Sequence, residues 1–243
     1  MGTIERRERE RLEVRGKIMD AARDLFAREG YEAVSMRRIA EAIEYSPTAI
    51  YLHFQDKLDL LQQICQSDFV ALAKELVDLQ QVTDPVERIR RMGHGYIRFA
   101  VTHPNHYRLM FMTPMQFSAE IAEQDPNKGN LDRDSYALLR HSCQEAIERG
   151  QIRPEYRNPD VVAQVFWAAV HGVASLHIVK ADNPWIDWKG VQRLAEAMVD
   201  AILRGMTTGE SEISNLKSEI SNLKSQTADL KFRPPAGDHE VRS

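Results

Sequence analysis

Residues 35–57 read SMRRIAEAIEYSPTAIYLHFQDK and carry the strongest structural signal in the chain. Ser35 and Ser46 each precede a helical pattern, where a hydroxyl side chain caps free backbone N–H groups. Pro47 follows Ser46 at the first helical position, where its missing N–H does no harm. Two helices joined by so short a turn must cross steeply. We therefore predict a helix-turn-helix motif over about residues 35–54.

The second helix of this motif would have one face in the core and one in solvent. Ile50 would point back toward the core, together with Ile39 and Ala40 of the first helix, and Phe54 also favours core packing. The outer face of a recognition helix is the one that reaches base edges in the major groove of DNA. That face carries Thr48, Ala49, Tyr51, Leu52 and His53.

Beyond the motif, apolar residues at three- and four-residue spacing indicate helices almost throughout, and no strand pattern of period two is found. A first helix is expected over about 10–29, ending at Gly30, because glycine readily takes the left-handed conformation of a helix C-terminus. A loop is expected over 113–130. The remaining helices are expected to start after Asp56 and after Asp84, and to cover about 105–112, 131–149, 159–180 and 187–204.

The last two of these helices differ in polarity. The 159–180 helix is apolar around much of its circumference, so we expect it to be buried. No apolar run approaches the roughly 18–20 residues of a membrane span, so no membrane association is expected. The 187–204 helix is amphipathic, and its apolar stripe fits either a dimer interface or packing within the chain: Val191, Leu194, Met198 and Ile202.

The composition excludes several classes of protein. The chain has 243 residues with a net charge of −4, a pI near 6.1 and two cysteines, Cys65 and Cys143. The cysteine count excludes a disulfide scaffold and a CxxC metal site, and it fits a reducing cytosol. The N-terminus lacks the apolar segment of a secretory signal. We find no GxSxG, glycine-rich phosphate loop or HExxH motif, so no enzyme, cofactor or metal is predicted, and a cytoplasmic location is expected.

The net charge by itself argues against binding to nucleic acid, because a strongly basic DNA-binding domain has a pI above about 9. Residues 1–57 hold 11 basic and 11 acidic side chains, so residues 58–243 account for the whole net charge of −4. The helix-turn-helix segment is therefore neutral. Binding to DNA would depend on a few placed cations such as Arg37, Arg38 and Lys57.

The segments FAREGYEAVSMRRIA (26–40) and SPTAIYLHFQDKLDLL (46–61) resemble the TetR family of bacterial transcriptional regulators. The resemblance implies an all-α fold with an N-terminal three-helix helix-turn-helix DNA-binding domain and a C-terminal helical bundle for ligand binding and dimerisation. It also implies a homodimer on a palindromic operator, most often a repressor, that a small-molecule effector releases. The expected divisions are a charged extension (1–10), the DNA-binding domain (11–72), the bundle (73–206) and a tail (207–243).

The resemblance also implies roles for residues at the DNA. In the family a lysine at the position of Lys57 contacts phosphate, and Tyr51 would offer its hydroxyl to phosphate or to a base edge. Glu44 stands where the family usually has glycine, so it must take a positive φ with strain of order 1 kcal/mol, or the turn has another shape. The expected DNA contacts are Ser35, Arg37, Arg38, Ser46, Thr48, Ala49, Tyr51, Leu52, His53 and Lys57.

In the bundle, the segment from Trp167 to His171-Gly172 resembles the Trp…His-Gly signature of a C-terminal subclass called WHG. By analogy the last two helices would pair with their copies in a dimer. A small apolar or amphipathic effector would lie among the middle helices, although each aromatic residue taken singly is more often simply core. The expected lining residues are Tyr96, Phe99, Tyr107, Met110, Phe111, Phe117, Trp167 and His171.

The tail contains a perfect tandem repeat, SEISNLK, over 211–217 and 218–224. With Ile and Leu at positions a and d, two heptads indicate either a short parallel coiled coil or a duplicated low-complexity extension, and the second is favoured because coiled coils need three or four heptads. The alternative function is therefore an all-helical interaction protein that uses these heptads. Residues 232–243 are expected to be disordered.

Overall fold

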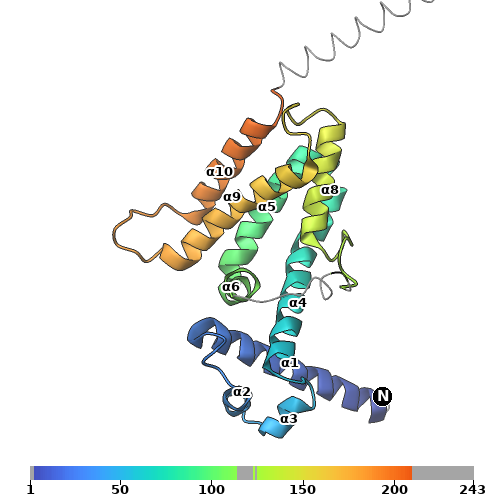
Figure 1. Cartoon of the computed structure of the whole chain (residues 1–243), viewed down its shortest axis with the longest axis vertical. Coiled ribbons are helices and arrows are strands. Elements are labelled where there is room, and N and C mark those ends of the chain that lie inside the picture. Colours follow the sequence, from blue (N-terminus) through green and yellow to red (C-terminus); the bar gives the residue numbers. More distant parts are fainter. Residues whose placement is uncertain (1–2, 114–122, 124, 210–243) are drawn as a thin grey trace, which may run out of the picture.

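A computed structural model of the chain describes residues 3–113, 123 and 125–209 (Figure 1). The expected pocket residue Phe117, the heptads of 211–224, the segment 232–243 and most of the expected 113–130 loop lie outside these residues. The described part is helical, as expected. Its helices are α1 (Thr3–Glu29), α2 (Met36–Ala42), α3 (Pro47–Tyr51), α4 (Lys57–Leu76), the 3₁₀ turn η1 (Val77–Gln81), α5 (Pro85–Thr102), α6 (Pro104–Met112), α8 (Ser135–Glu148), α9 (Pro159–Lys180) and α10 (Val191–Met206).

The sequence signals at the helix starts are confirmed. The side chain of Ser35 accepts a hydrogen bond from the backbone N–H of Arg38, and that of Ser46 accepts one from Ala49. The Asp56 carboxylate accepts from the N–H of Asp59 in the same way. These bonds satisfy donors that a helix N-terminus leaves free, and they fix where α2, α3 and α4 begin.

Helices α1, α2, α3 and the first half of α4 form one unit, the reading head, at the lower end of the molecule in Figure 1. Ile50 of α3 is completely buried and holds this short helix against its neighbours, and Phe54 is 2% exposed, so its expected core role is confirmed. The core of the reading head consists of Ile18, Met19, Ala22, Leu25, Phe26, Val34, Met36, Ile39, Ala40, Ile50, Phe54, Leu60, Leu61, Ile64 and Cys65, together with Leu109 of α6.

Helix α1 begins at Thr3, seven residues before the expected start, and its first turns carry the pairs Arg6–Glu10 and Arg9–Glu13. The interleaved charges near the N-terminus therefore support a solvated helix, because opposite charges four residues apart face each other on a helix surface.

Helices α5, α6, α8, α9 and α10 and the second half of α4 form a bundle with a separate core. Helix α4 belongs to both units, with Leu60 in the core of the reading head and Leu72 in that of the bundle. The expected division at 72–73 therefore falls within one continuous helix. Helices α5 and α9 approach closely at Gly93, where an added Cβ would lie 2.7 Å from Cζ of Phe166.

The expectation that α9 is buried is wrong for one of its faces. Phe166 and Val170 face the bundle core, whereas Val161, Leu176 and Val179 are 48%, 51% and 55% exposed. The expectation about apolar runs also needs correction, because α9 is long and apolar enough, by length and composition alone, to cross a membrane. In the described chain it packs against α5, α8 and α10 as a bundle helix.

Two other bounds differ from expectation, since α8 starts at Ser135 rather than 131 and α10 at Val191 rather than 187. Ile152 and Thr207 form an isolated antiparallel bridge that no sequence pattern indicated. It ties the chain just after α10 to the segment between α8 and α9.

Candidate functional site

Helix α3 buries Ile50 on one face, and its opposite face is exposed and carries both polar and apolar side chains. Tyr51 is 54% and Leu52 is 75% exposed, and Ser46 and Thr48 are also exposed. Ala49 is half-buried. Because Ile50 is packed and Ser46 caps the helix, α3 is held rigidly while its outer side chains stay available.

The turn between α2 and α3 has the conformation that glycine favours. Glu44 has φ 59°, within the left-handed region. The N–H of Tyr45 donates to the carbonyl of Ala40 at 3.0 Å, which satisfies a free carbonyl at the end of α2. The first of the two alternatives for Glu44 therefore holds, and a non-glycine residue here carries strain of about 1–2 kcal/mol.

Arg37 and Arg38 stand on the surface of the reading head. The Arg37 side chain is 80% exposed and pairs with Glu41 at 3.0 Å, whereas that of Arg38 is 50% exposed and lies 3.5 Å from Glu29. Exposed pairs of this kind are weak, so a phosphate can replace the carboxylate as partner. Both arginines are therefore available for contacts with a DNA backbone.

Lys57 stands in the first turn of α4, as expected, and makes contacts within the chain. Its half-buried ammonium donates to the carbonyl of Tyr31 at 2.9 Å and stands 4.2 Å from the centre of the Tyr31 ring. These contacts tie the start of α4 to the loop between α1 and α2. The expected phosphate contact at Lys57 stays a prediction, and a phosphate there would compete with a backbone carbonyl and a cation–π contact.

His53 is half-buried beside α1, with Nδ1 enclosed and without a hydrogen-bond partner in the described part of the chain. Burial, with the nearby charges of Arg11 and Arg15, lowers the pKa of His53 below its ordinary value. The ring is therefore neutral at pH 7 and adds no charge to the surface around α3.

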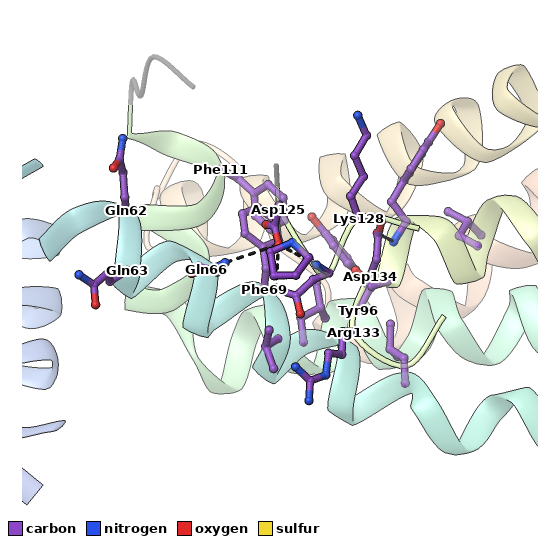
Figure 2. A pocket seen from close by; sticks show the side chains of 18 of the residues that line it. Gln62, Gln63, Gln66, Phe69, Tyr96, Phe111, Asp125, Lys128, Arg133 and Asp134 are labelled. Carbon is purple, nitrogen blue, oxygen red and sulfur yellow. Dashed lines mark hydrogen bonds between the residues drawn. The ribbon is translucent and has the colours of Figure 1, made fainter. Parts of the chain in front are cut away.

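A cavity of about 650 Å³ lies among α4, α5, α6, α8 and α9. Figure 2 shows the α4 glutamines on one side, the segment with Lys128 and Asp134 on the other, and Phe69 and Phe111 between them. The volume lies in the range of small-molecule sites. The lining consists of Asp59, Gln62, Gln63, Gln66, Phe69, Val70, Leu72, Leu76, Tyr96, Phe111, Asp125, Pro126, Asn127, Lys128, Arg133, Asp134, Ser135, Tyr136, Leu139 and Trp167.

The expected pocket residues divide into two groups. Tyr96, Phe111 and Trp167 lie on the cavity wall. The others described lie outside the lining: Tyr107 and Met110 are buried in the bundle core, Phe99 packs against His103 and His106, and His171 lies behind the wall bonded to Tyr107.

The α4 side of the cavity, with Phe69 and Gln66, did not emerge from the sequence as a lining. The length of α4 was the available signal, because a 20-residue helix extends well beyond a three-helix head and must present its second half to something else.

Behind the cavity wall, aromatic hydroxyls converge on one histidine. The Tyr107 hydroxyl lies 2.7 Å and that of Tyr96 3.1 Å from Nδ1 of His171, and the Trp167 indole donates to the Tyr96 oxygen at 3.3 Å. Burial raises the pKa of Tyr96 to about 12 and also raises that of Tyr107, while it lowers the pKa of His171. The cluster is therefore neutral at pH 7, and its polar groups form hydrogen bonds with one another.

A buried ion pair joins the reading head to the bundle. Arg23 of α1 forms two hydrogen bonds to the carboxylate of Asp68 on α4, at 2.9 and 3.1 Å, and Asp68 is 1% exposed. His106 of α6 places Nδ1 3.0 Å from the same carboxylate. Three helices thus meet at Asp68, and α6 also carries Tyr107 and Phe111 toward the cavity region.

Comparison with known proteins agrees with this geometry. Residues 18–64 match the family described as bacterial regulatory proteins, tetR family, and residues 89–202 match the tetracyclin repressor-like C-terminal domain. The chain belongs to the TetR family. The first match contains the helix-turn-helix, and the second contains most of the bundle.

Curated relatives are transcriptional regulators. The chain is 28% identical over 143 residues to the HTH-type transcriptional regulator AcrR of Shigella flexneri, covering 57% of this chain and 66% of that protein. It is 30% identical over 115 residues to the HTH-type transcriptional activator FasR of Mycolicibacterium smegmatis, covering 47% and 52%. The matches thus span between half and two thirds of these relatives.

Solved structures show the same fold. The fatty acid degradation regulator FadR from Bacillus halodurans has a TM-score of 0.64 at 19% identity, covering 78% of this chain and 94% of that one. AibR in complex with isovaleryl coenzyme A and operator DNA has a TM-score of 0.63 at 24% identity, covering 76% and 95%. The all-α fold of this TetR member, with its helix-turn-helix and helical bundle, is therefore shared.

Proposed function

We propose that this chain is a cytoplasmic transcriptional regulator, most simply a repressor, that binds a palindromic operator as a homodimer and responds to a small molecule in the cavity. The α3 face carries the proposal, because Tyr51 and Leu52 are exposed on a short helix that Ile50 and Ser46 hold in place. Such a helix enters the major groove with its outer side chains against base edges.

The neutral charge of the reading head limits how it binds DNA. Arg37 and Arg38 supply phosphate contacts at the start of α2, and Thr48 and Tyr51 supply contacts within the groove. Ser35 and Ser46 each accept one backbone hydrogen bond, and their O–H groups remain able to donate to a phosphate. Phosphate contacts make the affinity depend on salt.

The DNA-binding proposal is tested with an operator selected from a random double-stranded library, followed by titration at several salt concentrations. Tyr51→Ala is expected to weaken operator binding about tenfold, since a good base contact contributes about 1–3 kcal/mol. Arg37→Gln is expected to weaken binding to all sequences and to lower the salt slope by about 1. Lys74→Gln, an exposed cation on the bundle half of α4, is the matched control. If both variants bind as the parent does, this face is not the DNA interface.

We further infer that the exposed face of α9 pairs with a second copy of the chain. Val161, Val165, Leu176 and Val179 leave more than two fifths of their surface in solvent, an unusual amount for one helix face. Gly172 lies between them, and among the described residues, apart from its two chain neighbours and its own helix backbone, no atom comes within 4 Å of its missing Cβ. A glycine inside a helix destabilises it by about 1 kcal/mol relative to alanine, and close approach of a partner helix would account for its presence.

Helix α10 would contribute to the same interface. An apolar groove of about 400 Å³ lies beside α9, lined by Val173, Leu176, His177, Trp188, Leu194, Ala197 and Met198. Side chains of the partner would fill this groove. Two reading heads joined in this way would meet half-sites about one helical turn apart on DNA.

An effector in the cavity would act on DNA through α6. Phe111 lines the cavity, and His106 on the same helix approaches Asp68, which is bonded to Arg23 of the reading head. A ligand that moves α6 would change how α1 and α4 pack, and hence the distance between the two heads of a dimer. It can do so only if it binds the DNA-bound and the released arrangement of the helices with different free energy. Trp167 and His171, which both bond the Tyr96 hydroxyl, support placing this bundle in the WHG subclass.

A further inference from the structure

The wall of the cavity has an apolar part and a polar part. The apolar part combines Phe69, Leu72 and Leu76 of α4 with Phe111, Leu139 and Trp167. The polar part is formed by the α4 glutamines and by the segment before α8 (Figure 2). A ligand that fits both parts must be amphipathic.

The formal charges on the wall would suggest a cationic ligand. Asp59, Asp125 and Asp134 line the cavity, against two cations, Lys128 and Arg133. This count is misleading, because it ignores the partners that each charged group already has.

The carboxylates are largely engaged in holding the backbone. Asp134 accepts from the N–H groups of Tyr136 and Ala137 with one oxygen and from that of Gly129 with the other. Asp59 accepts from the N–H of Gln55 with one oxygen and from the Gln63 amide with the other. Each of these carboxylates keeps its charge, but both of its oxygens already accept hydrogen bonds from the chain, so it has fewer free acceptor sites for a ligand cation.

Asp125 is partly engaged in the same way. One of its oxygens accepts from the backbone and side chain of Asn127, at 2.8 and 2.9 Å, and from Gln66 at 3.5 Å. Its second oxygen has no hydrogen bond among the described residues. Of the six carboxylate oxygens on the wall, this one is thus left without a hydrogen bond among the described residues.

The two cations, in contrast, have no hydrogen bond or ion pair from their side chains within the described ranges, and both are exposed. Lys128 ends in three N–H donors and Arg133 in five. Both lie in the segment just before α8, whose N-terminus is already capped by the Asp134 carboxylate. The charged groups of the polar part that remain free to bond a ligand are therefore mainly cations.

The apolar part cannot receive the polar end of a ligand. The hydroxyls of Tyr96 and Tyr107 are already directed to His171, and the Trp167 N–H is directed to Tyr96. A charged group placed there would lose its hydration without gaining a partner. This fixes the orientation, with the apolar end of the ligand against the aromatic wall.

We propose that the cavity binds amphipathic monoanions, with the apolar body against Phe69, Phe111 and Trp167 and the anionic group at Lys128 and Arg133. The inference rests on the proposed function only in treating the cavity as a ligand site. It assigns a chemical class, of which a straight-chain carboxylate is the simplest member.

The test compares three probes with the same twelve-carbon chain below their micellar concentrations: dodecanoate, 1-dodecanol and dodecyltrimethylammonium. Isothermal titration calorimetry on the full chain, without DNA, measures each affinity. Dodecanoate is expected to bind at least about tenfold more tightly than the other two, because a hydrogen bond to a charged group contributes about 1.5–3 kcal/mol. Equal affinities, tighter binding of the cation or no binding of any probe would overturn the proposal.

Single substitutions test whether Lys128 and Arg133 bind the anionic group. Lys128→Gln and Arg133→Gln are each expected to weaken dodecanoate binding about fivefold and to leave dodecanol binding unchanged. Lys74→Gln and Arg98→Gln, exposed cations outside the lining, are the matched controls. Phe69→Ala should weaken all three probes alike. If neither Lys128→Gln nor Arg133→Gln alters dodecanoate binding, the charge assignment is wrong.

This experiment separates the ligand class from the regulatory role. If dodecanoate binds as described while operator affinity stays the same with and without it, the ligand class stands and the effector role of this site fails. If operator binding itself is absent in the parent protein, the proposed function fails while the calorimetric result is unaffected.

Discussion

Glu44 sets the angle between α2 and α3 through its own backbone. Its φ of 59° is the conformation that allows Tyr45 to bond back to Ala40 and the chain to turn into α3. The residue carries the strain of a side chain in the left-handed region, and it places a carboxylate beside the DNA-facing surface.

We therefore expect Glu44→Gly to raise the free energy of unfolding by about 0.5–1 kcal/mol, since relief of strain exceeds the extra entropy of glycine in the unfolded chain. Urea denaturation followed by circular dichroism measures this change. Glu44→Ala removes the charge and keeps the strain, so it should leave stability nearly unaltered. Equal stabilisation by both variants would mean that charge, not backbone strain, is the origin.

Single residues also show what the sequence could and could not predict. Ser35, Ser46 and Asp56 were predictable as caps because capping involves residues two or three apart in the chain. The contact of Lys57 with Tyr31 was not, because the two are 26 residues apart and meet only when α4 packs on the loop after α1.

Two helices, α4 and α6, contribute to the cores of both units, and α6 places Leu109 in the core of the reading head and Tyr107 in that of the bundle. Asp68 lies at the middle of α4, buried, with Arg23 of α1 on one side and His106 of α6 on the other. Loss of one partner of a buried pair typically destabilises by about 3–5 kcal/mol, and the cost here is expected at the lower end because Arg23 also bonds the exposed carboxylate of Asp20 at 2.6 Å.

Asp68→Asn is therefore expected to lower the stability of the protein by about that amount, and operator affinity should fall with it because the seating of the reading head loosens. Arg23→Met combined with Asp68→Leu should recover much of the stability without recovering the operator affinity. Arg6→Gln, which breaks an exposed pair on α1, is the control and should change stability by less than about 0.5 kcal/mol. Recovery of both properties by the double variant would show that the pair has no part in positioning the head.

Helix α9 shows a second limit of sequence reading. Its uniform apolarity predicted burial, but apolarity does not say whether the covering atoms belong to the same chain. Phe166 is covered by its own bundle and Val165, one residue before it, is 42% exposed.

The whole molecule is expected to be a dimer through that face. Val165→Asp should raise the dimer dissociation constant by a factor of about 100 or more, because two carboxylates would be brought together in an apolar contact. Analytical ultracentrifugation over a range of concentrations measures the shift, and an unchanged circular dichroism spectrum shows that the fold is kept. Leu12→Asp, at an exposed apolar position of α1, is the control. A Val165→Asp variant that remains as dimeric as the parent would place the interface elsewhere.

The bridge between Ile152 and Thr207 has a practical consequence for anyone who handles this protein. It secures the chain directly after α10, and the Arg153 N–H donates to the Met206 carbonyl beside it at 2.9 Å. In Figure 1 this point lies at the opposite end of the molecule from α3. A fluorophore, biotin or sensor surface attached at Gly209 would therefore sit at the end of the molecule opposite α3, and would leave the proposed DNA-contacting helix unobstructed.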